Sequence, residues 1–402
     1  TAGLLFETIE GDTTATGERA DTNTIYQLAS GTPYLVNGVL EYSGYNLTIR
    51  AAPDADIPPM IVQSAADDDA SGQLFRLRGG SNLTLEGLYL SGRATGGGVN
   101  DRIVRINTDD ATVRVIDCTL DGPAQSAFRV QGDGARIFVE NSVITRTGRP
   151  TDPTNGRFID NRGVSIDTLV VTNSTIYNST HYFYRNSGDG MIGYGLIDNN
   201  TFYNSALDGF DFGPVRELTF TDNIVANCVF IGAEQDDGEL DPRAQFAIDE
   251  ALGELTDIVI SNNNFYHEAD LVNNLPDTSA TGDTIVSLET IIFDSLSLAV
   301  IEAGGTAATN ISEVLRFVNP PVLPTQFQDD WLSDTTSGST VVSAMPWDMT
   351  GIDVYTPYTQ NLGPDRFVVF HDFCYDGNST SATAGTDGGP IGDINAGCDP
   401  VS

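Results

Sequence analysis

The chain contains no lysine, and all of its 19 basic residues are arginine. Aspartate and glutamate number 56, which gives a formal net charge of −37. A surface this negative repels phosphate backbones and anionic lipid headgroups, so nucleic acid and anionic membranes are excluded as natural partners. Cations screen the self-repulsion of such a surface, so it suits salty or calcium-containing water. A compositional bias of the genome explains the missing lysine equally well.

The sequence also lacks any apolar run of the roughly 20 residues that a membrane-spanning helix needs. It has three histidines and four cysteines, and they do not cluster at the spacing of transition-metal sites. Cys374 and Cys398 bracket a loop of small polar residues, which predicts a disulfide and favours an oxidising, extracellular location. Cys118 and Cys228 lie in periodic, strand-like segments, where we expect buried free thiols.

One segment, by contrast, recurs along the first two thirds of the chain. Each copy has two apolar residues at alternating positions, then a polar turn residue, then another apolar residue. The copies are NLTIRAAP (46–53), NLTLEGLYLSG (82–92), ATVRVIDCTLDG (111–122), ARIFVENSVITRTG (135–148), DTLVVTNSTIYNS (167–179), YGLIDNNTFYNS (194–205), ELTFTDNIVANC (217–228) and DIVISNNNFYHE (257–268).

The spacing of these copies predicts the fold. The apolar residue before the turn recurs at intervals of 36, 30, 24, 32, 26, 23 and 40 residues. One turn of a parallel β-helix takes about 22 to 30 residues, and insertions are confined to loops. We therefore expect an all-β, right-handed, single-stranded parallel β-helix with terminal caps. The residues predicted to stack are Ile49, Leu85, Val115, Val139, Val171, Ile197, Phe220 and Ile260.

The turn after each of these residues is expected to be a sharp, left-handed corner. Asn, Asp and Gly tolerate positive φ, and they occupy this position in every copy from 82 onward. In the next position, Asn200, Asn223 and Asn263 are predicted to stack as an amide ladder. The predicted corner residues are Gly87, Asp117, Asn141, Asn173, Asn199, Asp222 and Asn262.

The domain organisation follows from where the repeat begins and fades. Residues 1–24 are expected to form an N-terminal cap or an exchangeable strand that pairs with a neighbouring copy. Residues 25–270 form the predicted coil, 271–318 its C-terminal rungs and cap, and 319–402 a tail rich in Pro and Gly. The segment 240–255 is predicted to be a short helix inserted at the side of the coil.

A second strand series precedes the copies and predicts a cationic stripe. If the leading Phe or Val of each strand points inward, the next residue points outward. The predicted outward column is Arg76, Arg105, Arg129, Ile159, Tyr184, Asp211 and Ile231, and Asp160 and Arg185 are predicted to pair in the inward column. The three arginines are expected to bind an acidic polysaccharide. The alternative is that they pair with loop carboxylates such as Asp109, Asp110 and Asp133.

No cofactor is certain from the sequence, and calcium is the one candidate. Acidic loops supply the hard oxygen ligands that calcium prefers, although such loops are more often simply solvated. The candidate loops hold Asp67, Asp68 and Asp69, and later Asp236, Asp237, Glu239 and Asp241.

The opening IYQLASGTPYLV (25–36), the NST-type corners and the closing ATAGTDGGPIGD (382–393) resemble secreted pectate-lyase-like β-helix proteins. The likeness is to the chondroitinase-B-like and alginate-lyase-like branch and its uncharacterised relatives. It implies extracellular carbohydrate binding or cleavage. Lyases of that branch use a Lys and Arg pair, often with calcium, and the Lys is missing here. Arg162 or Arg185 would supply the arginine, with Tyr184 or His181 as a substitute base.

Three functions from different classes remain open at this stage. The first is a non-catalytic, secreted protein that binds acidic polysaccharide or assembles with copies of itself into a cell-surface filament or adhesin. The second is a polysaccharide lyase that acts by β-elimination. The third is an inverting glycoside hydrolase, because DGFDF (208–212) resembles a segment of polygalacturonases and Asp208 with Asp211 supplies two carboxylates. Without the lysine, we expect a binding protein rather than an enzyme.

Overall fold

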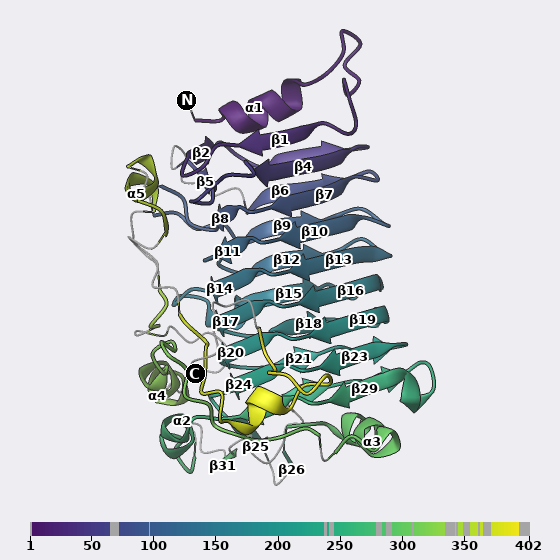
Figure 1. Cartoon of the computed structure of the whole chain (residues 1–402), viewed down its shortest axis with the longest axis vertical. Coiled ribbons are helices and arrows are strands. Elements are labelled where there is room, and N and C mark those ends of the chain that lie inside the picture. The colour runs from purple at the N-terminus through teal and green to yellow at the C-terminus, as the bar shows by residue number, and fades with distance from the viewer. Residues whose placement is uncertain are drawn as a thin grey trace.

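The computed structural model of the chain describes residues 2–393 except 65–71, 96, 237–238, 241–244, 279–283, 287–291, 308, 334–341, 343–344, 349–353, 361 and 365–370. These residues wind into a right-handed parallel β-helix whose turns stack along the long axis of the molecule (Figure 1). The predicted fold class is confirmed. No helix in this part of the chain is long and apolar enough to cross a membrane.

Successive turns of the coil contribute strands to three parallel sheets. The first sheet contains β1 (Ile25–Leu28), β4 (Asn46–Ala51), β7 (Asn82–Glu86), β10 (Thr112–Ile116), β13 (Ala135–Glu140), β16 (Ile166–Thr172), β19 (Ile192–Asp198), β22 (Pro214–Val215), β23 (Leu218–Thr221), β28 (Glu250–Ala251) and β29 (Ile258–Ser261). The second contains β2 (Pro33–Val36), β5 (Met60–Gln63), β8 (Tyr89–Ser91), β11 (Thr119–Asp121), β14 (Val143–Thr147), β17 (Thr175–Ser179), β20 (Thr201–Ser205), β24 (Ile224–Cys228) and β30 (Asn264–Tyr266).

The third sheet carries the side chains of greatest interest for function. It contains β3 (Leu40–Ser43), β6 (Gln73–Arg78), β9 (Arg102–Ile106), β12 (Ser126–Val130), β15 (Arg157–Asn161), β18 (Tyr184–Asn186), β21 (Phe210–Asp211) and β27 (Phe246–Ala247). A small antiparallel sheet near the C-terminal end of the coil contains β25 (Ala233–Asp236), β26 (Glu239–Leu240) and β31 (Thr284–Val286).

The register of the first sheet is the predicted one. Each apolar residue before the turn pairs with its equivalent on the next turn, from Ile49 opposite Leu85 to Phe220 opposite Ile260. All eight residues are buried in one continuous core. Because side chains alternate between the two faces of a strand, this register also decides which residues face solvent.

The corners have the predicted left-handed conformation. The seven predicted corner residues have φ between 48° and 67°. The predicted amide ladder also forms, since the side chain of Asn200 donates to Asn223, and that of Asn223 to Asn263, each at 3.0 Å. The ladder continues to Asn310. A second ladder, which was not predicted, joins Asn227, Asn204 and Asn178 near the ends of the second-sheet strands β24, β20 and β17.

The segment 240–255 does not form the predicted helix. Its described residues contain the short strands β27 and β28 and part of the 3₁₀ turn Leu255–Asp257. Phe246 of β27 pairs with Phe210, so this segment supplies the third-sheet strand of its turn. The sequence prediction placed Ile231 in that strand and the insertion at 240–255, whereas the extra strands β25 and β26 of this turn precede β27.

Both ends of the coil are covered by other elements. Helix α1 (Leu4–Gly11) buries Leu5, Phe6 and Ile9 against the first turn, so the N-terminal segment is a helix here rather than a strand. Helices α2 (Ala269–Asn273) and α3 (Ser295–Gly304) lie at the opposite end, and α4 (Thr325–Ser333) lies nearby (Figure 1). The chain then runs back along one side, where α5 (Tyr355–Thr359) packs near the N-terminal end (Figure 1).

We predict that Asn223→Ala lowers the free energy of unfolding by about 1–3 kcal/mol, because the buried amides of Asn200 and Asn263 each lose a partner. Denaturant unfolding measures this loss. The matched control is Asn173→Gly at a corner with φ of 48°, which should change stability by less than about 1 kcal/mol because glycine accepts that conformation. Equal losses in the two variants would show that the ladder contributes nothing specific.

Candidate functional site

The outer surface of the third sheet carries a column of charged side chains, which we call the arginine face. Its members occupy equivalent positions on successive turns, directly after the buried residues Phe75, Val104, Phe128, Ile159, Tyr184 and Phe210. In order from the N-terminal end the column reads Glu41, Arg76, Arg105, Arg129, Asp160, Arg185 and Asp211.

This column corrects part of the sequence prediction. Arg76, Arg105, Arg129 and Asp211 do point outward, but Ile159 and Tyr184 point into the core. Their outward places are taken by Asp160 and Arg185, which are in register on adjacent turns but in the outward column rather than the inward one. Ile231 is buried outside the third sheet.

The error was a slip of one residue. The prediction took the first Phe of each strand as the inward-facing residue. In β15 both Phe158 and Ile159 are buried, and it is Ile159 that pairs with the inward-facing Phe128. Aligning the five-residue strands β12 and β15 end to end would have placed Arg129 opposite Asp160.

Asp160 is the centre of the arginine face. Its side chain is fully buried, and a carboxylate there is costly unless cations neutralise it. Arg129 binds it at 2.8 Å through both Nε and Nη2. Arg185, Arg162 and Arg157 approach it at 3.5, 3.7 and 3.9 Å. One negative charge is therefore shared by four guanidinium groups, which leaves a local excess of positive charge.

In the N-terminal part of the column the counter-charge is the partly exposed Glu41 rather than a buried carboxylate. Glu41 pairs with Arg76 at 3.0 Å and with Arg78 at 3.3 Å. Arg105, between Arg76 and Arg129, donates to the side chain of Gln131 at 2.7 Å and has no ion pair with any carboxylate that the structure describes. Burial and the neighbouring arginines lower the pKa of Arg105. It is thus the cation of this column with the least neutralisation.

The loop carboxylates offered as alternative partners do not neutralise these arginines. Asp109 accepts a hydrogen bond from the backbone N–H of Asp133 at 2.9 Å, and Asp133 accepts one from the backbone N–H of Ser165 at 2.9 Å. Asp110 occupies a left-handed corner with φ of 56°. The counter-charges of the column are instead Glu41 and Asp160, neither of which the sequence prediction used for this purpose.

The C-terminal end of the column holds a second titratable group. Asp211 follows Arg185 in the column, and burial together with the carboxylates of Asp249 and Asp208 raises the pKa of Asp211 to about 7. The neighbouring Asp208 accepts a hydrogen bond from Nε2 of His181 at 3.0 Å. A carboxyl group that is half protonated near neutral pH can donate or accept a proton.

The four residues predicted as catalytic candidates lie near one another but differ in access. Arg162 and Arg185 are partly exposed and pair with Asp160. His181 is bound at both ring nitrogens, with Asp208 at Nε2 and Arg157 3.1 Å from Nδ1, and burial lowers its pKa. Tyr184 lies in the core beside Asn161, and burial raises its pKa, so it does not reach a ligand on the outer face.

The predicted calcium and disulfide residues lie largely outside the described part of the chain. Asp67, Asp68, Asp69, Asp237 and Asp241 are not described, and of Asp236 and Glu239 only the backbone strands are. Among the described residues no group of three or more acidic, His or Cys side chains could hold a metal ion. Cys374 is buried and disulfide-bonded, whereas Cys398 lies outside the described residues, so their pairing stays a prediction. Cys118 and Cys228 are buried free thiols, as predicted.

Comparison with known proteins supports the fold and is silent on chemistry. The family model described as a right-handed beta helix region matches residues 102–274, which include most of the arginine face. No curated protein matches the chain. The match concerns the coil and does not distinguish a pectate-lyase-like branch from other β-helix proteins.

We predict that Asp160→Asn destabilises the fold by about 3–5 kcal/mol, because four guanidinium groups lose their shared buried anion. Glu41→Gln is the control, since Glu41 is 46% exposed and its surface pairs are worth at most about 1 kcal/mol. Denaturant unfolding of both variants tests the prediction. It is wrong if Asp160→Asn costs no more than Glu41→Gln.

Asp211 predicts a pH dependence of stability. Because its pKa is raised to about 7 in the folded protein, the folded state binds more protons than the unfolded state between about pH 4 and pH 7. Its contribution is therefore most favourable below about pH 4 and is lost as the pH rises through 7. Asp211→Asn should raise the melting temperature more at pH 8 than at pH 5. A shift of the same size at both pH values would contradict the assignment.

Proposed function

We propose that this chain is an extracellular protein that binds an acidic polysaccharide along the arginine face. The observation that carries the proposal is the position of Arg105, which lies between two other arginines and has no ion pair with any carboxylate in the described part of the chain. Like charges on neighbouring strands destabilise a sheet unless a counter-charge is present. A bound anionic ligand supplies that counter-charge.

The charge distribution of the whole chain supports a functional role for these arginines. The chain has a net charge of −37, yet four of the seven residues of the column are arginines, and three further arginines pair with its carboxylates. The column itself contributes the carboxylates Glu41, Asp160 and Asp211. The seven arginines are Arg76, Arg105, Arg129 and Arg185 in the column and Arg78, Arg157 and Arg162 beside it.

The shape of the site favours a linear polymer over a small anion. Strands in a sheet lie roughly 4.8 Å apart, so the column presents guanidinium groups at regular steps along the coil axis. A polysaccharide with repeated carboxylates or sulfates matches such a row. Guanidinium forks bind both kinds of group through paired hydrogen bonds, which also explains how a chain without lysine can form the site.

The structure gives unequal support to the two catalytic alternatives. Lyase activity is disfavoured because neither predicted base is available. Tyr184 lies in the core, and both ring nitrogens of His181 already have partners. A hydrolase is favoured by one observation, the raised pKa of Asp211 beside Asp208. Two carboxyl groups in different environments are what acid and base catalysis of glycoside hydrolysis requires.

We predict that the purified chain is retained on immobilised alginate, pectin or a sulfated glycan, and that retention weakens as salt is raised. Arg105→Ala should weaken binding about five-fold, the effect of losing about 1 kcal/mol from a partly exposed charged contact. Arg114→Ala is the matched control, since Arg114 belongs to the first-sheet strand that follows β9 and packs on the ring of Phe138. Equal retention of wild type, Arg105→Ala and Arg114→Ala would reject the arginine face as the binding site.

The same incubations distinguish binding from cleavage. Release of reducing ends that Asp211→Asn abolishes would establish the hydrolase. New ultraviolet absorbance from an unsaturated sugar would establish the lyase. Retention without either signal is the result we expect.

A further inference from the structure

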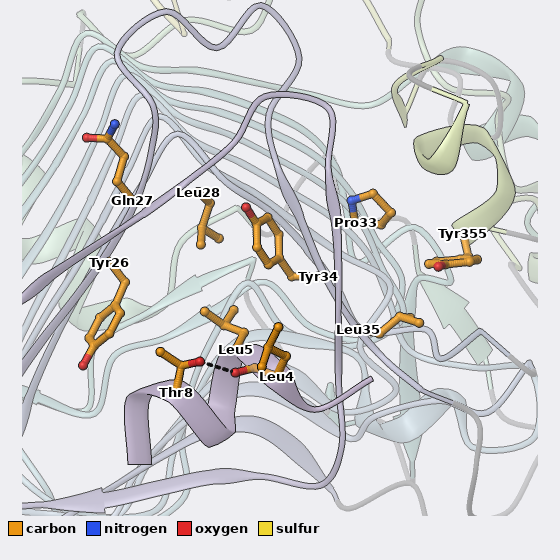
Figure 2. A pocket seen from close by; sticks show the side chains of 10 residues that line it. All are labelled: Leu4, Leu5, Thr8, Tyr26, Gln27, Leu28, Pro33, Tyr34, Leu35 and Tyr355. Carbon is orange, nitrogen blue, oxygen red and sulfur yellow. Dashed lines mark hydrogen bonds between the residues drawn. The ribbon is translucent and has the colours of Figure 1, made fainter. Parts of the chain in front are cut away.

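A cavity of about 360 Å³ opens at the N-terminal end of the coil, away from the arginine face (Figure 2). Its walls come from α1, from the first strands of the first and second sheets and from α5, so both ends of the sequence contribute to it. The lining residues are Leu4, Leu5, Thr8, Tyr26, Gln27, Leu28, Pro33, Tyr34, Leu35 and Tyr355.

Core contacts hold both movable walls in place. Helix α1 is anchored by Leu5, Phe6 and Ile9, and the ring of Phe6 lies 5.8 Å from that of Phe75. Helix α5 is anchored by Tyr358, whose ring lies 5.7 Å from that of Tyr89. The cavity is therefore largely formed before any ligand arrives, and its volume falls within the range of small-molecule sites.

The chemistry of the lining is that of a site for a neutral ring. None of the ten lining residues carries a charge, and three of them are tyrosines. Figure 2 shows Tyr34 in the middle of the lining, with Tyr26 to one side and Tyr355 to the other. Tyrosine rings offer broad apolar faces with a polar edge, and they suit ligands that are apolar on one side and polar on the other.

The polar groups of the lining narrow the choice of ligand further, because most of them already have hydrogen-bond partners. The hydroxyl of Tyr26 donates to Asp12 at 2.8 Å, and that of Thr8 donates to the carbonyl of Leu4 at 2.6 Å. The hydroxyl of Tyr34 accepts from the backbone N–H of Ala29 at 2.8 Å, which leaves its own hydrogen to donate. Gln27 uses its oxygen to accept from Arg50 at 3.3 Å, which leaves its amide hydrogens. The hydroxyl hydrogen of Tyr34 thus supplies a donor that matches a ligand with acceptor oxygens.

We propose that this cavity binds one uncharged pyranose ring, with an apolar face of the sugar against Tyr34 and a sugar oxygen accepting from the Tyr34 hydroxyl. An acidic sugar is disfavoured because no cation lines the cavity and the chain as a whole is strongly negative. A wholly apolar ligand is disfavoured because it would take this hydroxyl out of water without replacing its hydrogen bond. The site shares no residue with the arginine face and does not depend on the proposed function.

The test is saturation-transfer NMR on the full chain with methyl β-D-glucopyranoside and methyl α-D-mannopyranoside as probes. We expect transfer to at least one probe, and binding at least ten-fold weaker in Tyr34→Leu. Tyr194→Leu, a substitution on the first sheet away from the cavity, should bind as the wild type does. Arg105→Ala should also bind normally, which separates this site from the polysaccharide site.

Several outcomes would overturn the assignment. These are no transfer to either glycoside, equal transfer in Tyr34→Leu and wild type, and binding of phenol or methyl glucuronate but of neither neutral glycoside. Sedimentation velocity tests whether a second copy of the chain, rather than a sugar, occupies the cavity. If Tyr34→Leu abolishes a concentration-dependent association that the glycosides leave unchanged, then a second copy of the chain occupies the cavity and the sugar site is rejected.

Discussion

The left-handed corner that follows seven strands of the first sheet is the constraint on which this structure depends. Seven corners with φ between 48° and 67° return the chain at the same angle on every turn, so equivalent residues lie directly above one another. The side-chain amides of Asn200, Asn223, Asn263 and Asn310 then join neighbouring corners through hydrogen bonds of 3.0 Å. A slip of one residue in this register would exchange core and surface along the whole strand.

The same register brings arginines that are far apart in the sequence side by side on one face, where their positive charges add up. Arg76 and Arg105, 29 residues apart, and Arg105 and Arg129, 24 residues apart, become neighbours on adjacent strands. Their mutual repulsion is relieved unevenly, by Glu41 near one end and by the buried Asp160 further along. The stretch around Arg105 between them keeps its positive charge, on a molecule that is otherwise negative. A polyanion is the ligand that such an arrangement attracts and orients.

The N-terminal helix and the part of the chain that follows the coil both pack on the coil and have structural roles there. Helix α1 covers the first turn, and α5, from the C-terminal part of the sequence, packs beside it. The segment 371–393 is fixed along the coil by hydrogen bonds to Asp222, Thr175 and Glu313. Capping of this kind protects the strand edges, which would otherwise recruit other chains. At the N-terminal end it also encloses a cavity whose walls lie far apart in sequence.

The sequence by itself determined the coil, because its signals are local: alternating strands, corner residues that accept positive φ, and a spacing of one copy per turn. It also placed Arg76, Arg105 and Arg129 on one face. Only the tertiary structure decided which residues of β15 and β18 face outward. Phe158 and Ile159 are both buried, so the hydrophobic pattern fits either alignment of the strand. That choice put Asp160 and Arg185 in the outward column and Tyr184 in the core. The pairing of Glu41 with Arg76 and the approach of Tyr355 to α1 likewise depend on contacts between distant segments, which no local pattern encodes.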